Sequence, residues 1–219
     1  MMSGVVFLLL AQAASAVDLN VDDRPLVYRV ALQETPSRGI AVGYPNQFNY
    51  VLDSVSLTPL YIWTGGFLNL DGELKGRGGN PCSIRGARIE LNLLRSPLRF
   101  GDASREPEDT VFTGYRRKGR EAPVLQAEID GHQVAMRLWS EAKNQVTIEY
   151  ELAEDRRKGV YFSTAGFTKE AVTPGEGVTW LADDSALTLP VGKRSFRVTL
   201  DLTGRKGLMM KKQKAKSEK

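Results

Sequence analysis

The 219-residue chain contains one cysteine and one histidine, and this scarcity excludes several kinds of site. A lone cysteine, Cys82, can form neither an intrachain disulfide nor a four-thiolate metal site, and a lone histidine, His132, excludes zinc sites with several histidine ligands. The haem-attachment motif Cys-x-x-Cys-His, the Gly-x-x-x-x-Gly-Lys-Ser/Thr phosphate loop, the Gly-x-Ser-x-Gly elbow and a strand-linked Gly-x-Gly-x-x-Gly are all absent. We therefore expect no cofactor and no metal site, and the sequence assigns no catalytic residue.

A hydrophobic run long enough to cross a bilayer as a helix is also missing. Residues 4–13 are apolar, whereas a spanning helix needs about 20 apolar residues. Ala14-Ser15-Ala16 follows, with small residues at the −3 and −1 positions of a signal-peptidase site. No lysine or arginine precedes the run, which departs from the usual signal. We predict a signal peptide over residues 1–16 and a periplasmic or secreted protein, with a buried N-terminal helix or strand as the alternative.

The body of the chain has no net positive charge, and the excess of positive charge lies at its end. The last sixteen residues carry seven Lys or Arg and one Glu, a net charge of +6, while the whole chain carries +4, so the residues before Gly204 sum to −2. The tail lacks the aromatic residues that accompany basic side chains in nucleic-acid-binding surfaces. We predict a disordered, solvated tail over residues 204–219 and no nucleic-acid partner; weak attraction to anionic lipid is the alternative.

Between the two ends, short β-rich runs replace any helical period. In residues 146–152, Val146, Ile148, Tyr150 and Leu152 share one face, and this period-two alternation is typical of antiparallel sheets with one buried face. Asp-Gly, Pro-Gly and Asp-Asp turn signals separate the runs. The expected strands are 26–32, 40–44, 48–52, 60–63, 88–94, 111–115, 124–129, 134–139, 146–152, 160–163, 178–181 and 196–202. We predict an all-β fold, an antiparallel β-sandwich of about a dozen strands, as a single domain over residues 17–203.

Aromatic residues gather in one segment. Residues 44–67 hold six of the eighteen Phe, Trp and Tyr residues, among them Tyr61 and Trp63. Sugars and flat ligands stack on aromatic rings, and Tyr and Trp add hydrogen bonds. Aromatic residues on strands also fill cores. The segment is therefore either part of the core or a ligand platform.

A glycine-rich loop, Gly76-Arg77-Gly78-Gly79-Asn80, follows the aromatic segment. Its glycines permit converging backbone N–H groups, and Arg77 offers a planar, permanently charged fork for carboxylate or phosphate. A tight structural turn, with Arg77 paired to a carboxylate such as Asp71, explains the loop equally well. The predicted ligand-binding residues are Tyr61, Trp63, Asp71, Arg77 and Asn80.

Three carboxylates nearby suit an enzymatic alternative. Asp53, Asp71 and Glu73 would supply a general acid and base for a glycoside if two of them lay about 5–10 Å apart. His132 follows an Asp-Gly turn, and we expect it to be exposed at a hairpin tip. Cys82 is expected to be a buried, inert thiol.

Two blocks of the chain, residues 24–82 and 110–152, carry a resemblance. The quoted motifs are Arg24-Pro25-Leu26-Val27-Tyr28-Arg29, Ile40-Ala41-Val42-Gly43-Tyr44-Pro45, Leu60-Tyr61-Ile62-Trp63-Thr64-Gly65-Gly66-Phe67-Leu68, Thr113-Gly114-Tyr115-Arg116 and Ile129-Asp130-Gly131. This series resembles an uncharacterised β-rich domain of secreted planctomycete and verrucomicrobial proteins. That domain often occurs beside c-type cytochrome domains and sugar-dehydrogenase-like propellers. The resemblance implies a sandwich fold, an extracytoplasmic setting and no known reaction.

Three functional hypotheses follow. The first is a secreted binding or accessory module for carbohydrate or for a partner redox protein, a c-type cytochrome or a sugar dehydrogenase. The second is a carbohydrate-active enzyme that uses one of the three carboxylates as acid or base. The third is a structural cell-envelope protein held to the surface by its basic tail.

Overall fold

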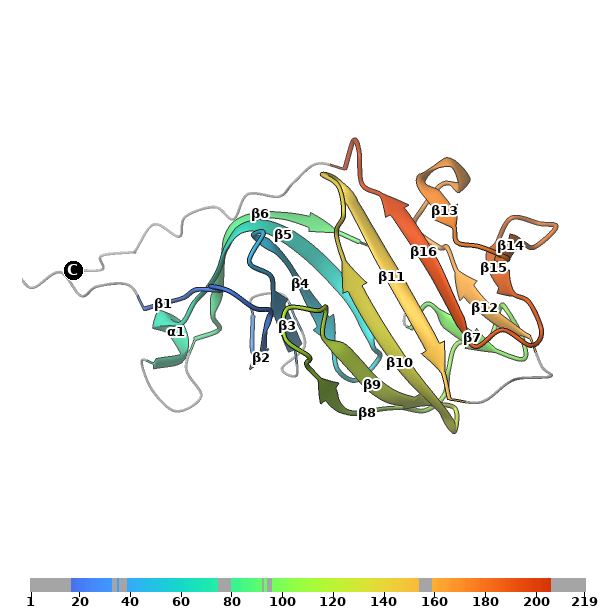
Figure 1. The fold of residues 1–219 in the computed structure, drawn as a ribbon, viewed down its shortest axis with the longest axis horizontal. Coiled ribbons are helices and arrows are strands. Elements are labelled where there is room, and N and C mark those ends of the chain that lie inside the picture. Colours follow the sequence, from blue (N-terminus) through green and yellow to red (C-terminus); the bar gives the residue numbers. More distant parts are fainter. Residues whose placement is uncertain are drawn as a thin grey trace, which may run out of the picture.

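The computed structural model describes residues 17–32, 35, 39–74, 80–91, 93, 96–153 and 159–205, and Figure 1 shows their arrangement. The predicted signal peptide, Arg77 with its neighbouring glycines, and residues 206–219 of the predicted tail lie outside these described residues. Strands dominate the described chain and pair antiparallel in three sheets, which confirms the predicted all-β, sandwich-like fold. Among the described residues, no helix has the length and apolar character needed to cross a membrane.

The N-terminal region is a sheet that curls on itself. Its strands run in the order β1-β5-β4-β3-β2, and β6 pairs with the other side of β5. A parallel bridge between Leu32 and Cys82, with the Cys82 N–H donating to the Ala31 carbonyl at 2.9 Å, connects the β2 edge to the β6 edge. The sheet therefore closes into a small barrel. Its strands are β1 (Asp18–Leu19), β2 (Leu26–Val30), β3 (Gly39–Gly43), β4 (Phe48–Asp53), β5 (Thr58–Asn69) and β6 (Ser83–Glu90).

The barrel interior is a core of its own. Trp63 is fully buried, and its ring stacks on Phe67 with centroids 6.0 Å apart. The indole Nε1–H donates to the carbonyls of Gly66 and Phe67, both at 3.1 Å, so its one polar group is satisfied inside the core. Close strand contact there requires glycine, because a Cβ on Gly86 would lie 2.0 Å from the Thr64 carbonyl oxygen.

The C-terminal region is a sandwich of two sheets. One has the strand order β13-β16-β11-β10-β9-β8, and the other has the order β14-β15-β12-β7. The first sheet consists of β8 (Thr110–Arg116), β9 (Val124–Ile129), β10 (His132–Trp139), β11 (Gln145–Leu152), β13 (Val172–Pro174) and β16 (Ser195–Asp201). The second consists of β7 (Leu98–Phe100), β12 (Val160–Ser163), β14 (Thr179–Trp180) and β15 (Ala186–Leu189). A 3-10 turn (Lys169–Ala171) precedes β13.

The main core joins the two regions. The inner residues of β10 and β11 pack with those of β12, β15 and β16, and one face of the barrel sheet, with Tyr50 and Leu52, contributes to the same cluster. In β11 the predicted alternation holds: Val146, Ile148 and Tyr150 are buried, while the side chains between them point to the outer face. One face of the barrel sheet and the sandwich therefore share one continuous hydrophobic core, which is separate from the core inside the barrel.

Turns and short strands account for most differences from the predicted elements. The Asp130-Gly131 signal forms the β9–β10 hairpin, with positive φ at both residues, 47° and 76°. Asp71-Gly72 instead opens a one-turn helix, α1 (Asp71–Leu74), in the long connection between the antiparallel strands β5 and β6. Strands of two to four residues, such as β1, β7 and β13, are too short for a period-two pattern to reveal.

The described residues include the first two residues of the predicted tail, Gly204 and Arg205. The Arg205 guanidinium donates to the carbonyls of Glu90 and Leu91 at 3.1 and 2.9 Å and to the carbonyl of Gly166, and it lies 3.9 Å from the centre of the Phe167 ring. Arg205 thus fastens the end of β6 to a turn of the sandwich. Gly204 and Arg205 of the predicted tail are thus part of the described structure, and the prediction for residues 206–219 is left untested.

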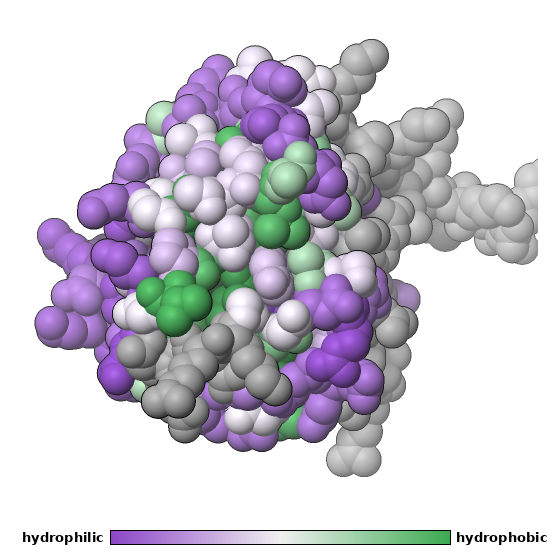
Figure 2. Space-filling view, turned by 90° about the vertical axis from the view of Figure 1, so that its right-hand side faces the viewer, coloured by the Kyte–Doolittle hydropathy of each residue, from purple (hydrophilic) through white to green (hydrophobic). Residues whose placement is uncertain are grey.

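The end of the molecule on the β7, β12, β14 and β15 side carries mainly polar side chains. In Figure 2, hydrophobic residues on this face form small groups separated by hydrophilic ones. Scattered apolar side chains of this kind are normal on a protein surface. The apolar groups on this face therefore do not by themselves indicate a binding surface.

Candidate functional site

The two aromatic residues of the predicted site are buried and are not accessible to a ligand. Tyr61 and Trp63, both on β5, are 3% and 0% exposed and belong to the barrel core. Trp63 has no ring face open to solvent, so the structure places both residues in the core, one of the two alternatives that the sequence left open. The other aromatic residues of the segment, including Tyr44 and Phe48, are also at least nine-tenths buried.

The polar members of the predicted site are dispersed around α1. The Asp71 carboxylate accepts the Val17 N–H at 2.8 Å, which ties the start of the described chain to α1. Asn80 is exposed. Arg77 lies outside the described residues, so its pairing with Asp71 or with a ligand remains a prediction. Tyr61 and Trp63 therefore offer no open ring surface beside these polar groups.

The three carboxylates proposed for acid–base chemistry have separate roles. Asp53 is the last residue of β4 and lies beside the start of β5. Its carboxylate accepts hydrogen bonds from the Val55 N–H at 3.0 Å and from the Ser56 hydroxyl at 2.6 Å. Asp71 lies beyond the other end of the twelve-residue β5, too far away to form a pair with Asp53 across about 5–10 Å. These two residues therefore cannot act together on one glycosidic bond.

Glu73 instead closes one end of the barrel interior. Its Oε2 accepts hydrogen bonds from the Cys82 thiol at 3.2 Å and from the Tyr28 hydroxyl at 3.3 Å. Burial, followed by the nearby Glu73 carboxylate, raises the pKa of Cys82 to about 12, in line with the buried, inert thiol expected from the sequence. His132 is half-buried, and its ring meets the Phe100 ring edge-on with the two ring centres 4.5 Å apart. The expectation of an exposed side chain at a hairpin tip is therefore corrected.

A different site lies where the barrel meets the sandwich. Strand β9 pairs with β10 only from His132 to Met136, so the last three residues of β10 have no β9 neighbour. The Tyr44 hydroxyl, at the β3–β4 turn, enters this gap and donates to the Leu138 carbonyl. Burial raises the pKa of Tyr44, so the hydroxyl remains a donor. The gap opens into a hollow of about 500 Å³, called here the Trp139 pocket.

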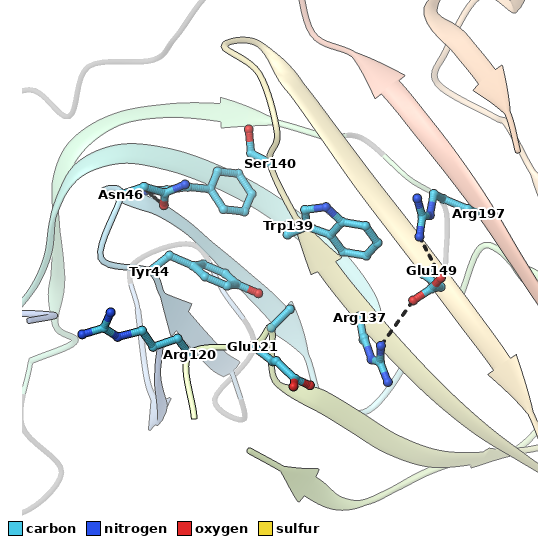
Figure 3. A pocket seen from close by; sticks show the side chains of 11 residues that line it. Tyr44, Asn46, Arg120, Glu121, Arg137, Trp139, Ser140, Glu149 and Arg197 are labelled. Carbon is cyan, nitrogen blue, oxygen red and sulfur yellow. Dashed lines mark hydrogen bonds and ion pairs between the residues drawn. The ribbon is translucent and has the colours of Figure 1, made fainter. Parts of the chain in front are cut away.

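Aromatic rings form one wall of the Trp139 pocket (Figure 3). Trp139 is half-buried, and its Nε1–H donates to the Glu141 carboxylate at 2.9 Å. In Figure 3 the indole lies between Tyr44 and the Arg197 guanidinium, whose carbon is 5.1 Å from the centre of the Trp139 ring. Unlike Trp63, this tryptophan lies at the surface and lines a hollow.

Charged groups from three adjacent strands form the opposite wall. Arg137, Glu149 and Arg197 lie side by side on β10, β11 and β16. One oxygen of the Glu149 carboxylate faces Arg137 at 3.6 Å, and the other accepts from Arg197 at 3.2 Å. Two guanidinium groups thus share one carboxylate, and their remaining N–H groups have no hydrogen-bond partner among the described residues. Arg120 and Glu121, both exposed, complete the rim.

This arrangement is suited to binding rather than to covalent chemistry. A hollow of about 500 Å³ falls within the range of small-ligand sites, which combine apolar walls with a few oriented polar groups. Fixed guanidinium forks suit hydroxyl, carboxylate or phosphate oxygens, because they donate in one plane. Among the residues that the structure describes, no group of three or more His, Cys, Asp or Glu side chains lies together as a metal site.

The sequence carried only part of the signal for the Trp139 pocket. Alternation in residues 134–139 and 146–152 places Arg137, Trp139 and Glu149 on the faces opposite the core. Nothing in the sequence pairs these strands in register or brings Arg197, nearly fifty residues from Glu149, beside them. Tyr44 belongs to the aromatic segment singled out from the sequence, but its partner Leu138 is far away along the chain.

No family model, curated protein or solved structure matches this chain.

Proposed function

We propose that the chain is an extracytoplasmic binding or accessory module whose ligand is a carbohydrate, and that the Trp139 pocket is its binding site. The proposal keeps the ligand class expected from the sequence and moves the site from the barrel to the junction of barrel and sandwich. Localisation outside the cytoplasm and membership of the resembled β-rich domain family are part of the proposal.

The observation that carries the proposal is a half-buried tryptophan lining a surface hollow beside oriented hydrogen-bonding groups. A sugar ring presents C–H groups on its faces and hydroxyls around its edge, so it suits an aromatic ring next to fixed polar donors and acceptors. Arg137 and Arg197 are held by Glu149, so less side-chain freedom is lost when a ligand binds.

Binding of neutral and acidic oligosaccharides, screened first on a glycan array and then by titration calorimetry, tests the proposal. Trp139→Ala should abolish binding while leaving the fold intact. Trp180→Ala is the matched control, because Trp180 is also a half-buried strand tryptophan with a nearby cation, the Lys169 ammonium at 5.6 Å, but it does not line the Trp139 pocket. Equal loss of binding in both variants, or saccharide binding that survives Trp139→Ala, would refute the site.

A further inference from the structure

We infer that the ligand is an acidic oligosaccharide of several units, bound along the outer face of the β8–β9–β10–β11–β16 sheet from the Trp139 pocket to a second hollow. This inference rests on the proposed function and names the charge and the length of its ligand. Its evidence is a second hollow on the same face and the sign of the charge along that face.

The second hollow, of about 320 Å³, is called here the Arg194 pocket. Its walls include Gln126 of β9, Ala135 of β10, Glu151 of β11 and the exposed guanidinium groups of Arg116 and Arg194. Neither arginine forms an ion pair with a described residue. Among the described residues that line this pocket, two positive groups therefore stand beside a single carboxylate.

The two pockets share one face of one sheet. Along β10, the side chains of Ala135, Arg137 and Trp139 alternate with buried Val134, Met136 and Leu138, so all three point outward. Strand pairing sets Glu151 beside Ala135 and Glu149 beside Arg137, two neighbouring rows of the same outer face.

The distance between the two pockets along β10 sets the length that a ligand needs to reach both. Four residues of β10 separate Ala135 in the Arg194 pocket from Trp139 in the Trp139 pocket, about 13 Å of strand. A single sugar ring occupies only one of the two pockets, and a linear oligosaccharide laid along β10 reaches both.

Charge along this path is opposite in sign to the charge of the fold. The Trp139 pocket holds three arginines against two glutamates, and the Arg194 pocket holds two arginines against one glutamate. Together these lining residues sum to +2, and the Glu141 carboxylate that accepts from the Trp139 indole lowers the charge of the described groups along the path to +1, whereas all residues before Gly204 together sum to −2. A local excess of guanidinium groups on a net-acidic fold favours an anionic ligand, and uronic-acid carboxylates match the planar fork of arginine.

Titration calorimetry with galacturonic acid oligomers and the full chain tests this inference at low salt. The hexamer should bind at least tenfold more tightly than its fully methyl-esterified form, in which each carboxylate is replaced by an uncharged methyl ester. The double substitution Arg116→Gln with Arg194→Gln should weaken hexamer binding about tenfold and leave dimer binding unchanged, because a dimer fills the Trp139 pocket alone. Added salt should reduce this difference, since both arginines are exposed.

The charge-matched control is Arg24→Gln with Arg29→Gln, two exposed arginines of the barrel region that line neither pocket. Equal affinity for the acid and the ester, with binding still dependent on Trp139, would overturn this inference and leave the proposed function standing. Hexamer binding unaffected by Trp139→Ala and by the Arg116/Arg194 double variant would locate the interaction at the basic tail and overturn both. Failure of every saccharide, acidic or neutral, to bind would also overturn both.

Discussion

Trp63 and Trp139 are both strand tryptophans, and they lie in opposite environments. Trp63 is sealed inside the barrel, where two main-chain carbonyls accept from its indole nitrogen. Trp139 lies on the outer face of a sheet, where a side-chain carboxylate accepts from its indole nitrogen and a guanidinium approaches its ring. Curling and closure of the first sheet bury the one, whereas the other lies on the outer face of β10 beyond the point where β9 begins.

This contrast separates residues that hold the fold together from residues available to a ligand. A tryptophan whose polar group is satisfied by the main chain contributes to stability through burial. A tryptophan that lines a hollow beside unpaired donors contributes to binding. Substitutions in the two regions should therefore affect different measurements.

The largest effect is expected at the centre of the barrel. Trp63→Ala should lower the free energy of unfolding by about 3–5 kcal/mol, because it leaves a large cavity against Phe67. Urea denaturation followed by circular dichroism measures the loss. A change below about 1 kcal/mol would mean that the barrel interior is not a tightly packed core.

The next effect concerns the contact between the two regions. Arg205→Ala removes three hydrogen bonds from a guanidinium to main-chain carbonyls and should destabilise the protein by about 1–3 kcal/mol. The melting temperature should fall by several degrees. A chain that stops at Arg205 should melt like the full chain, whereas one that stops at Thr203 should match Arg205→Ala. Identical melting of the chains ending at Thr203 and Arg205 would contradict this role.

A smaller effect is expected from the titration of Cys82, whose thiol is buried inside the barrel. The raised pKa of Cys82, about 12 when folded against about 9 in a free thiol, means that the unfolded chain loses this proton first as the pH rises. The Cys82 contribution to stability is therefore complete below about pH 9 and is lost progressively between about pH 9 and pH 12.

Denaturation at a series of alkaline pH values measures this loss. Cys82→Ala should show a shallower alkaline decline than the natural chain, and the thiol should react with Ellman's reagent at pH 8 only after unfolding. Rapid reaction in the folded protein would show that Cys82 is accessible.

The smallest stability effect is expected at the Trp139 pocket. Trp139→Ala should cost less than Trp63→Ala by at least about 2 kcal/mol, because a half-buried surface ring gives up less burial and leaves no enclosed cavity. Parallel urea titrations of the two variants measure this difference. Equal destabilisation would remove the distinction between core and ligand-facing tryptophan.

The sequence predicted the strands better than their partners. The sequence predicts strands at residues 124–129, 134–139, 146–152 and 196–202, with period-two alternation in residues 146–152, and the structure confirms a strand in each place. These patterns are local, since successive side chains of a strand point to opposite faces. The predicted site was less successful, because an aromatic cluster on strands looks the same from sequence whether it fills a core or faces a ligand.

The sequence by itself determined the all-β class and the period-two alternation of residues 146–152, which places Glu149 on a face away from the core. Only the tertiary structure decided that the bridge from Leu32 to Cys82 closes the first sheet around Trp63. It also decided that β9 begins too late in the chain to pair with Trp139 and that Arg197 completes the charged wall. The physical reason is that strand pairing and sheet closure join residues far apart in the chain, which a local pattern does not encode.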